Sequence, residues 1–344
     1  MVLAQSLTPP RVPAAPSVLT DPLFALVQSI RPAPAGVPQA LWEAALFGPV
    51  REFLARPGKR FRARLVELSW HLAGRTDAPP APLPLIVELL HAGSLIVDDI
   101  EDDSVQRRGR ATLHRQIGLP LALNTGNWLY FWPLSLLGEL GLPCVAEREL
   151  YRRSVDAVRR CHEGQALDLQ ARVGELHPAE IGGVAHTISA WKTGSLMALS
   201  AALGAVAAGA SIATIDALVA FGERLGVGLQ MQNDLSELTG AAGPLKHPED
   251  LLKGRVTWPW AWAAGRLPAA RFDSLQARGT KLTDGTGDSA AVARDLLAAL
   301  GDDPARPVRE WLAAALADLS DAVPAGPALD AIRAEVTRLE RQYA

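Results

Sequence analysis

The chain has 344 residues, of which 49% are apolar and 21% are charged, so it has room for one large domain or two of ordinary size. This composition excludes a disordered or collagen-like chain. Its 34 Lys and Arg residues against 37 Asp and Glu residues give a net charge of −3, and without a basic field we expect no nucleic-acid partner.

The first 40 residues differ from the rest of the chain because they hold eight prolines, at positions 9, 10, 13, 16, 22, 32, 34 and 38. This density of proline predicts a flexible or loosely docked arm. The segment has neither a basic start nor a continuous apolar run, so we expect no signal peptide.

From residue 41 onward, apolar residues recur at helical spacing nearly throughout, and strand-like alternation is scarce. The spacing predicts helices over residues 40–54, 59–73, 83–105, 120–139, 146–173, 178–191, 193–210, 212–238, 256–264, 267–277, 288–300, 306–322 and 327–342. A run of Gly, Thr and Asp predicts a loop over 279–288. We expect a single all-α domain over 41–344, with the last three helices, from about residue 288, as an appendage.

Two further features bear on the setting of the protein. Residues 193–215 carry no charge but are mostly Ala, Gly and Ser, so they predict a closely packed buried helix and no membrane span. The chain has only Cys144 and Cys161, with no CxxC or Cys/His cluster. This argues against structural zinc and a disulfide framework, and it favours a reducing, cytoplasmic location.

The predicted helix over 83–105 is mostly apolar but carries one narrow polar stripe. Steps of three and four residues place Glu88, His91, Ser94, Asp98 and Asp102 on one helical face. A mostly apolar helix is expected to be buried, so the stripe must line a wet cavity or meet polar partners.

The stripe ends in an acidic run from Asp98 to Asp103 that holds five carboxylates in six residues. So many like charges repel one another, and divalent cations would relieve the repulsion. Asp98 and Asp102 lie one turn apart and can bind one hard metal ion together. Oxygen ligands such as these favour Mg²⁺. The alternative is a solvated acidic helix end.

The predicted helix over 212–238 carries a second polar stripe of lower charge. Glu223, Gln230 and Glu237 are spaced by seven residues, and Asn233 and Asp234 lie between the last two. Oxygen ligands again recur at i and i+4, although this stripe taken alone favours an ordinary polar helix end.

Basic residues complement these acids. One cluster lies at a predicted helix start, where backbone N–H groups add to the fixed cations and make a good diphosphate cradle: Lys59, Arg60, Arg62 and Arg64. A second cluster follows the acidic run, as Arg107-Arg108-Gly109-Arg110. The planar guanidinium group of arginine can bind two phosphate oxygens at once. Lys192-Thr193 lies at a predicted joint between two apolar helices, and Arg255 follows another break.

In order, these segments resemble the trans-isoprenyl diphosphate synthases, or polyprenyl synthetases, and within them the geranylgeranyl diphosphate synthases. The resemblance covers about residues 40–265. The matching runs are Gly58-Lys59-Arg60-Phe61-Arg62, Glu88-Leu89-Leu90-His91, Asp98-Asp99-Ile100-Glu101-Asp102, Arg107-Arg108-Gly109, Gly164-Gln165-Ala166-Leu167-Asp168, Lys192-Thr193-Gly194, Gln230-Met231-Gln232-Asn233-Asp234-Leu235-Ser236-Glu237 and Asp250-Leu251-Leu252-Lys253-Gly254-Arg255.

The resemblance implies an isoprenoid-synthase-type helical bundle around a deep central cavity, usually as a homodimer. It implies an enzyme that condenses isopentenyl diphosphate with an allylic prenyl diphosphate. The implied metal ligands for Mg²⁺ are Asp98, Asp102, Asn233 and Glu237, and the implied catalytic residues are Asp98, Asp99, Asp102 and Lys192.

The resemblance also assigns the two substrates. It implies isopentenyl diphosphate binding by Lys59, Arg62, His91 and Arg108, and allylic diphosphate binding by Arg107, Lys192, Thr193, Gln230, Lys246 and Arg255. In the family, residues at the positions of Gly93 and Ser94 form part of the cavity floor. Both are small here, so we expect geranylgeranyl diphosphate or a longer product.

The sequence departs from the family pattern at five positions. The second acidic motif is usually DDxxD, but here it begins with Asn233 and ends with Glu237. In addition, Val97 replaces a common His, Ala63 replaces a usual Pro, and Arg255 replaces a usual Lys. Two alternatives therefore stay open. One is a class I terpene cyclase on the same scaffold, against which the set of Lys59, Arg62 and His91 argues. The other is a non-catalytic subunit that binds prenyl diphosphate, against which the intact first motif argues.

Overall fold

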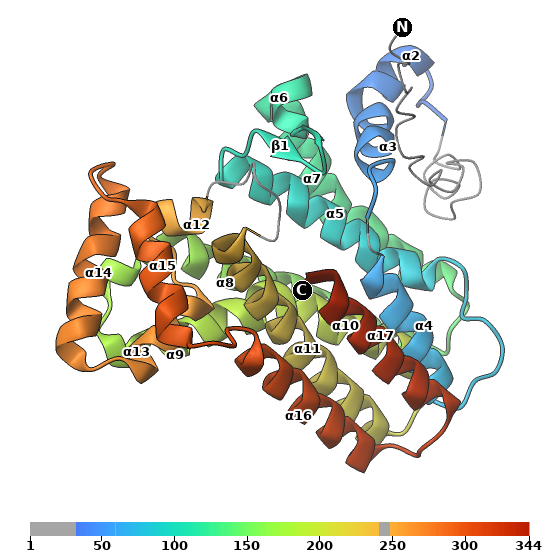
Figure 1. The fold of residues 1–344 in the computed structure, drawn as a ribbon. Helices are drawn as coiled ribbons and strands as arrows, with labels where there is room; N and C mark the ends of the chain where they lie inside the picture. The colour runs from blue at the N-terminus through green and yellow to red at the C-terminus, as the bar shows by residue number, and fades with distance from the viewer. Residues whose placement is uncertain (1–31, 59, 241–247, 344) are drawn as a thin grey trace, which may run out of the picture. The chain divides into compact units, whose positions relative to one another are not determined.

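The computed structural model describes residues 32–58, 60–240 and 248–343 (Figure 1). The chain divides into two compact units, which are described separately below: unit 1 comprises residues 1–59 and 92–128, and unit 2 comprises residues 60–91 and 129–344. Most of the proline-rich arm predicted over 1–40 lies outside the described residues. The arm and the single domain over 41–344 therefore stay predictions.

Helices make up nearly all the regular structure of the described residues, so the all-α prediction is confirmed. The elements of unit 1 are α2 (Gln39–Trp42), the π-helix η2 (Glu43–Phe47), α3 (Gly48–Leu54), β1 (Gln106–Arg107), β2 (Arg110–Ala111) and α6 (Leu113–Ile117). Two long helices contribute residues to both units, α5 (Leu83–Glu101) and α7 (Leu119–Ser135).

Unit 2 holds the remaining helices. These are α4 (Phe61–Leu72), η3 (Leu136–Glu139), α8 (Cys144–Gln170), η4 (Val173–Glu175), α9 (Pro178–Ile188), η5 (Ser189–Gly194), α10 (Ser195–Ala207), α11 (Ile212–Thr239), α12 (Glu249–Leu252), α13 (Trp258–Arg266), α14 (Ala269–Thr283), α15 (Ser289–Leu300), α16 (Arg306–Ala322) and α17 (Pro327–Tyr343).

Helix α10 lies at the centre of unit 2, and all its residues from Ser195 to Val206 are buried. Its small side chains allow neighbouring helices to come close, since a Cβ atom on Gly204 would lie 2.1 Å from the carbonyl oxygen of Val66 in α4. The prediction of a buried, closely packed helix over 193–215 is therefore confirmed for Ser195–Val206, whereas the end of the segment lies in a turn and the start of α11, where Ile212 is 78% exposed. Among the described residues, no helix is long and apolar enough to span a membrane.

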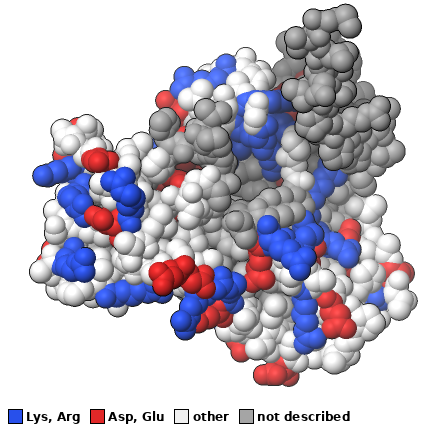
Figure 2. All heavy atoms as spheres, viewed as in Figure 1, with Lys and Arg blue, Asp and Glu red and all other residues white. Residues whose placement is uncertain are grey.

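Two C-terminal helices pack on the same core, α16 beside α11 and α17 beside α4 (Figure 1). Leu312 of α16 is buried against Gly228 of α11. The indole Nε1 of Trp311 donates a hydrogen bond to the carbonyl oxygen of Arg224 (2.7 Å). The outer faces of α16 and α17 carry interspersed basic and acidic side chains (Figure 2). Exposed pairs of this kind contribute little to stability.

Two corrections to the predicted boundaries concern α5 and α14. Helix α5 ends at Glu101 instead of residue 105, and the hairpin of β1 and β2 follows, which the helical pattern did not predict. Helix α14 continues to Thr283, through half of the predicted loop over 279–288. Gly279 sits under the ring of Trp260, and Leu282 is buried, so packing holds this glycine-containing segment helical.

Candidate active site

The acidic run of unit 1 begins on the last turn of α5. The backbone N–H of Asp102 donates to the carbonyl oxygen of Asp98 (2.9 Å), so these two residues lie one helical turn apart. Asp98 and Asp102 are partly exposed, whereas Asp99 between them is only 1% exposed. The run therefore separates into one buried carboxylate, Asp99, and four that solvent reaches.

Arg107, in β1, binds two of these carboxylates. Its Nε lies 2.7 Å from Oδ1 of Asp99, and its Nη2 lies 2.6 Å from the same atom and 3.2 Å from Oδ2 of Asp98. Burial raises the pKa of Asp99, although the hydrogen bond from Arg107 opposes this. Burial alone would lower the pKa of Arg107, but its bonds to Asp99 leave that pKa raised, so the guanidinium stays charged.

The hairpin turn places the second arginine. Arg107 pairs with Arg110, and the two turn residues, Arg108 and Gly109, both have positive φ, at 55° and 76°. This is the geometry of a type I′ turn. The Arg108 guanidinium lies against Gly58, because a Cβ atom there would be 3.0 Å from its Nη1. The structure therefore brings Arg108 to Gly58, and Lys59 lies outside the described residues.

The two chain-length candidates, Ser94 and Gly93, precede Asp98 by four and five residues, a little more than one helical turn. Gly93 is buried and Ser94 is half-buried. A Cβ atom on Gly126 of α7 would lie 3.3 Å from the carbonyl oxygen of Gly93 and 2.9 Å from Val97. Close packing of α5 on α7 thus uses a glycine at position 126, and the role of Gly93 in product length stays a prediction.

In unit 2, two predicted cations converge on a carboxylate that the sequence analysis did not assign to the site. Lys192 Nζ donates to Oδ2 of Asp168 (2.7 Å), and Arg255 Nη1 lies 3.3 Å from the same oxygen. Arg255 is buried and also donates to the carbonyl oxygen of Asp168. Asp168 could have been found from the sequence, because it ends the run that begins Gly164-Gln165 and resembles the family.

Thr193 and Gln230 form part of one hydrogen-bonded chain. Thr193 Oγ1 donates to Oε1 of Gln230 (2.9 Å), and Gln230 Nε2 donates to Oδ1 of Asp234 (2.8 Å). Oδ2 of Asp234 accepts from the backbone N–H of Trp258 (2.9 Å). Burial raises the pKa of Asp234 to about 8, although both bonds favour the charged form. Asp234 therefore joins η5, α11 and α13.

The two predicted metal ligands of α11 differ in exposure. Asn233 is exposed, and Glu237 is partly buried. Oε1 of Glu237 accepts a hydrogen bond from the backbone N–H of Asp250 (2.8 Å). Burial, together with the nearby Asp250 carboxylate, raises the pKa of Glu237 to about 8. Lys246, predicted to assist here, lies outside the described residues.

The start of α4 differs from the prediction. The helix begins at Phe61 instead of Lys59, and Arg60 precedes it with a φ of 47°. Arg62 and His91 are both half-buried. The backbone N–H of Ala63 donates to Oε1 of Glu88 (3.0 Å), a bond that a proline at position 63 would remove.

The predicted joint at Lys192-Thr193 is also wrong. The chain runs from α9 into α10 without a break, through the π-helical segment η5. Gly164 allows α8 to approach this segment, since a Cβ atom there would lie 2.5 Å from the backbone nitrogen of Lys192. A π-turn widens the helix locally and is common at functional sites.

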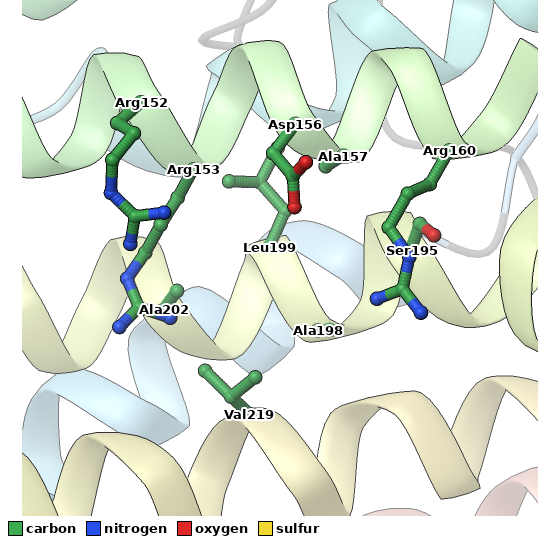
Figure 3. Close-up of a pocket in the computed structure, with 10 residues that line it drawn as sticks. All are labelled: Arg152, Arg153, Asp156, Ala157, Arg160, Ser195, Ala198, Leu199, Ala202 and Val219. Atoms are coloured by element: carbon green, nitrogen blue, oxygen red, sulfur yellow. The ribbon is translucent and has the colours of Figure 1, made fainter.

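A separate groove of about 90 Å³ lies over α10, between α8 and α11 (Figure 3). Its rim carries three arginines, but each is paired with a carboxylate. Arg152 and Arg153 both bind Glu149, and Arg160 binds Glu223 (3.1 Å). None of these arginines lies in the runs that match the family, so we assign no diphosphate site to this groove.

In the part of the chain that the structure describes, no group of three or more His, Cys, Asp and Glu side chains is arranged to hold a metal ion. The donor set is nevertheless suitable for Mg²⁺, which needs only one or two protein carboxylates when substrate phosphates complete its coordination. Asp98 and Asp102 supply such a pair. Oδ2 of buried Asp99 has no hydrogen-bond partner among the described residues.

Comparison with known proteins defines the class. The family model for polyprenyl synthetase matches residues 43–284. The chain is 30% identical over 221 residues to a geranylgeranyl pyrophosphate synthase of Eremothecium gossypii, covering 63% of this chain and 68% of that protein. It is 31% identical over 249 residues to heptaprenyl diphosphate synthase component 2 of Geobacillus stearothermophilus, covering 72% and 74%.

Solved structures agree in fold. The crystal structure of a polyprenyl synthetase from Streptomyces coelicolor A3(2) has a TM-score of 0.75 at 26% identity, covering 94% of this chain and 95% of that one. A trans-prenyltransferase is the class of enzyme that the fold and the family model define. The chain belongs to the polyprenyl synthetase family, as its motifs predicted.

Proposed function

We propose that this enzyme condenses isopentenyl diphosphate with an allylic prenyl diphosphate, in a reaction that needs Mg²⁺, to give geranylgeranyl diphosphate or a longer all-trans product. The observation that carries the proposal is the pair Asp98 and Asp102, one turn apart and partly exposed, beside the charged Arg107. The names of relatives support it, since several are geranylgeranyl diphosphate synthases and one is a heptaprenyl diphosphate synthase component.

Asp98 and Asp102 would hold Mg²⁺ with the diphosphate of the allylic substrate, and Asn233 and Glu237 would contribute further oxygens. Asn233 can bind only through its uncharged carbonyl oxygen, so we expect weaker metal binding there than an aspartate would give. A bound Mg²⁺ would withdraw negative charge from the departing diphosphate.

We assign residues to each substrate. The allylic diphosphate would be bound by Arg107, Lys192, Thr193, Gln230, Lys246 and Arg255. Isopentenyl diphosphate would be bound by Lys59, Arg62, His91 and Arg108. Arg107 and Lys192 are already hydrogen-bonded to carboxylates that hold their charged groups in place. Preorganised donors of this kind stabilise negative charge as the allylic C–O bond breaks.

The condensation itself consumes only the two substrates. The π electrons of isopentenyl diphosphate form the new C–C bond to the allylic carbon while the C–O electron pair leaves with the diphosphate. The proton lost from the adduct passes to a basic oxygen, for which the released diphosphate is available. The cations of this chain would hold that diphosphate in place until the proton has transferred.

Product analysis tests the proposal against cyclisation. Purified enzyme with Mg²⁺ is given farnesyl diphosphate alone or farnesyl plus isopentenyl diphosphate. We expect a longer prenyl diphosphate only when both are present. A hydrocarbon or alcohol from farnesyl diphosphate alone would show a cyclase, and no turnover of either would favour a non-catalytic subunit.

The isopentenyl site has its own test. We expect Lys59→Ala combined with Arg62→Ala to weaken binding of isopentenyl diphosphate strongly and of the allylic substrate much less. Equal affinity for isopentenyl diphosphate in the wild type and the double variant would contradict this assignment. Arg64→Ala is a suitable control, because Arg64 is exposed and paired with Glu67 (2.9 Å).

We also propose that the enzyme is a homodimer in a reducing, cytoplasmic setting. In support, the large apolar side chains that unit 2 exposes include Phe131 at 72%, Val145 at 73% and Val155 at 56%. Cys144 and Cys161 are free thiols. Sedimentation equilibrium is the direct test of the dimer, and a monomer at micromolar concentration would contradict it.

A further inference from the structure

A buried arginine holds the hairpin that carries Arg107 and Arg108. Arg56, just after α3, is 2% exposed, and its guanidinium lies 5.1 Å from the centre of the Phe53 ring. Its Nη2 lies 2.9 Å from the carbonyl oxygen of Ala111, and its Nη1 lies 3.3 Å from that of Arg107. Burying an arginine is costly unless its donors are satisfied, and here main-chain oxygens satisfy two of them.

These two oxygens belong to opposite strands of the hairpin. Arg107 is in β1 and Ala111 is in β2, on the two sides of the turn at Arg108-Gly109. One planar guanidinium thus bridges both strands. Nη2 of Arg56 also donates to Oε2 of Glu52 (2.8 Å), which joins the hairpin to α3.

The residues on this hairpin are those assigned to diphosphate binding. Arg107 is bound to Asp98 and Asp99, and Arg108 has a φ of 55°, an unfavourable backbone conformation for a residue with a side chain. Such a conformation persists only where neighbouring contacts hold it. The bonds from Arg56 to the strand on each side of the turn supply such contacts.

We propose that Arg56 is a positioning residue for diphosphate binding: by bridging the two strands, it holds the hairpin main chain so that Arg108 meets isopentenyl diphosphate beside Gly58. The proposal rests on the proposed function, which assigns Arg108 to that substrate. Lysine cannot replace Arg56 here, because its single ammonium group lacks the planar, separated N–H donors with which a guanidinium reaches both carbonyl oxygens and Glu52.

The first test compares Arg56→Ala with Arg51→Ala. Arg51 is also in this segment and pairs with Glu43, but no contact joins it to the hairpin among the described residues. We expect Arg56→Ala to raise KM for isopentenyl diphosphate about tenfold or more with a much smaller change in kcat, as for a misplaced binding group. We expect Arg51→Ala to leave both unchanged. An unchanged KM in a folded Arg56→Ala would overturn the proposal.

Chemical rescue separates positioning from general loss of structure. Arg56→Ala leaves a space lined by two carbonyl oxygens and Glu52, which fits a guanidinium ion. Millimolar guanidinium should lower the raised KM, whereas the same concentration of sodium chloride should not. If guanidinium does not restore KM, the proposal fails. Should Arg56→Ala not fold, Arg56→Lys takes its place; a normal KM in that variant would also overturn the proposal, since lysine cannot bridge both strands.

A double-mutant cycle with Arg108→Ala distinguishes this proposal from the proposed function. If Arg56 acts through Arg108, the double variant should bind isopentenyl diphosphate about as weakly as Arg108→Ala alone. Additive losses would overturn the positioning role. If Arg108→Ala itself binds isopentenyl diphosphate normally, the assignment of Arg108 in the proposed function is what fails.

Discussion

The carboxylates of this enzyme differ in burial, and we expect them to differ in function accordingly. Asp99 is buried and bound to Arg107, and Asp234 is buried and accepts two hydrogen bonds. Asp98 and Asp102 are partly exposed on successive turns. Solvent, and with it a hydrated cation, reaches Asp98 and Asp102, so that pair is our candidate for the metal.

Replacing Asp98 or Asp102 by alanine should nearly abolish turnover and leave the fold intact. Loss of one ligand in a metal-assisted ionisation is expected to cost about a thousandfold in rate. Steady-state kinetics with Mg²⁺ measures the loss, and circular dichroism checks the fold. Glu101→Ala is the matched control, since Glu101 is an exposed carboxylate on the same turn. Near-normal activity in both aspartate variants would rule out this metal assignment.

Asp234 should make stability depend on pH. Its pKa is about 8 in the folded enzyme against an ordinary value of 3.8, so between these values the folded state binds the extra proton. Its contribution to the free energy of unfolding therefore falls as pH rises from about 4 to about 8. Urea unfolding of metal-free enzyme at about pH 5 and about pH 8 measures this change.

The Asp234→Asn variant should show a smaller loss of stability between these two pH values than the wild type. Asp273→Asn, which changes an exposed carboxylate in α14, is the control and should keep the loss of the wild type. Equal pH dependence in wild type and Asp234→Asn would mean that Asp234 is ionised throughout this range.

Among the helices, glycines set how closely α8, η5 and α11 approach. A Cβ atom on Gly164 of α8 would lie 2.5 Å from the nitrogen of Lys192, and one on Gly226 of α11 would lie 2.5 Å from Cα of Gly194. Real contacts are never this short, so the helices would have to separate. The pair of Lys192 and Asp168 spans the same interface between α8 and η5.

We therefore expect Gly164→Ala to lower the free energy of unfolding by about 1–3 kcal/mol and to reduce activity, because the added methyl group moves Lys192. Gly183→Ala in α9 is the control, since nothing lies within 4 Å of an added Cβ there. That change should be neutral or stabilise the helix by up to about 1 kcal/mol. Thermal unfolding of both variants measures the difference, and equal effects would contradict the packing argument.

At the scale of the whole molecule, the length of the product depends on how much space the growing chain finds. Gly93 and Ser94 are both small, so we expect the wild type to make geranylgeranyl diphosphate or longer products. Gly93→Phe should shorten the product and spare the first condensation, since position 93 precedes Asp98 by more than one turn. Chromatography of dephosphorylated products measures this. An unchanged product distribution, or farnesyl diphosphate as the wild-type end product, would place the limit elsewhere.

Local sequence patterns were enough to predict most of the helices and the residues that share a helical turn. Apolar spacing predicted α8, α11, α16 and α17 closely, because helix geometry depends on neighbours three and four residues apart. The same local rule placed Asp98 and Asp102 one turn apart. The family could also be predicted, because its motifs keep their order along the chain.

The contacts between groups far apart in the sequence could not be predicted in this way. Asp168 binds Arg255, 87 residues away, and Arg56 binds the hairpin 51 and 55 residues away. No periodic pattern encodes such pairs, since they depend on which helix faces pack together and how closely glycines let them approach. Burial, which raises the pKa of Asp234, is likewise a product of packing: the same carboxylate on the surface would be charged at neutral pH.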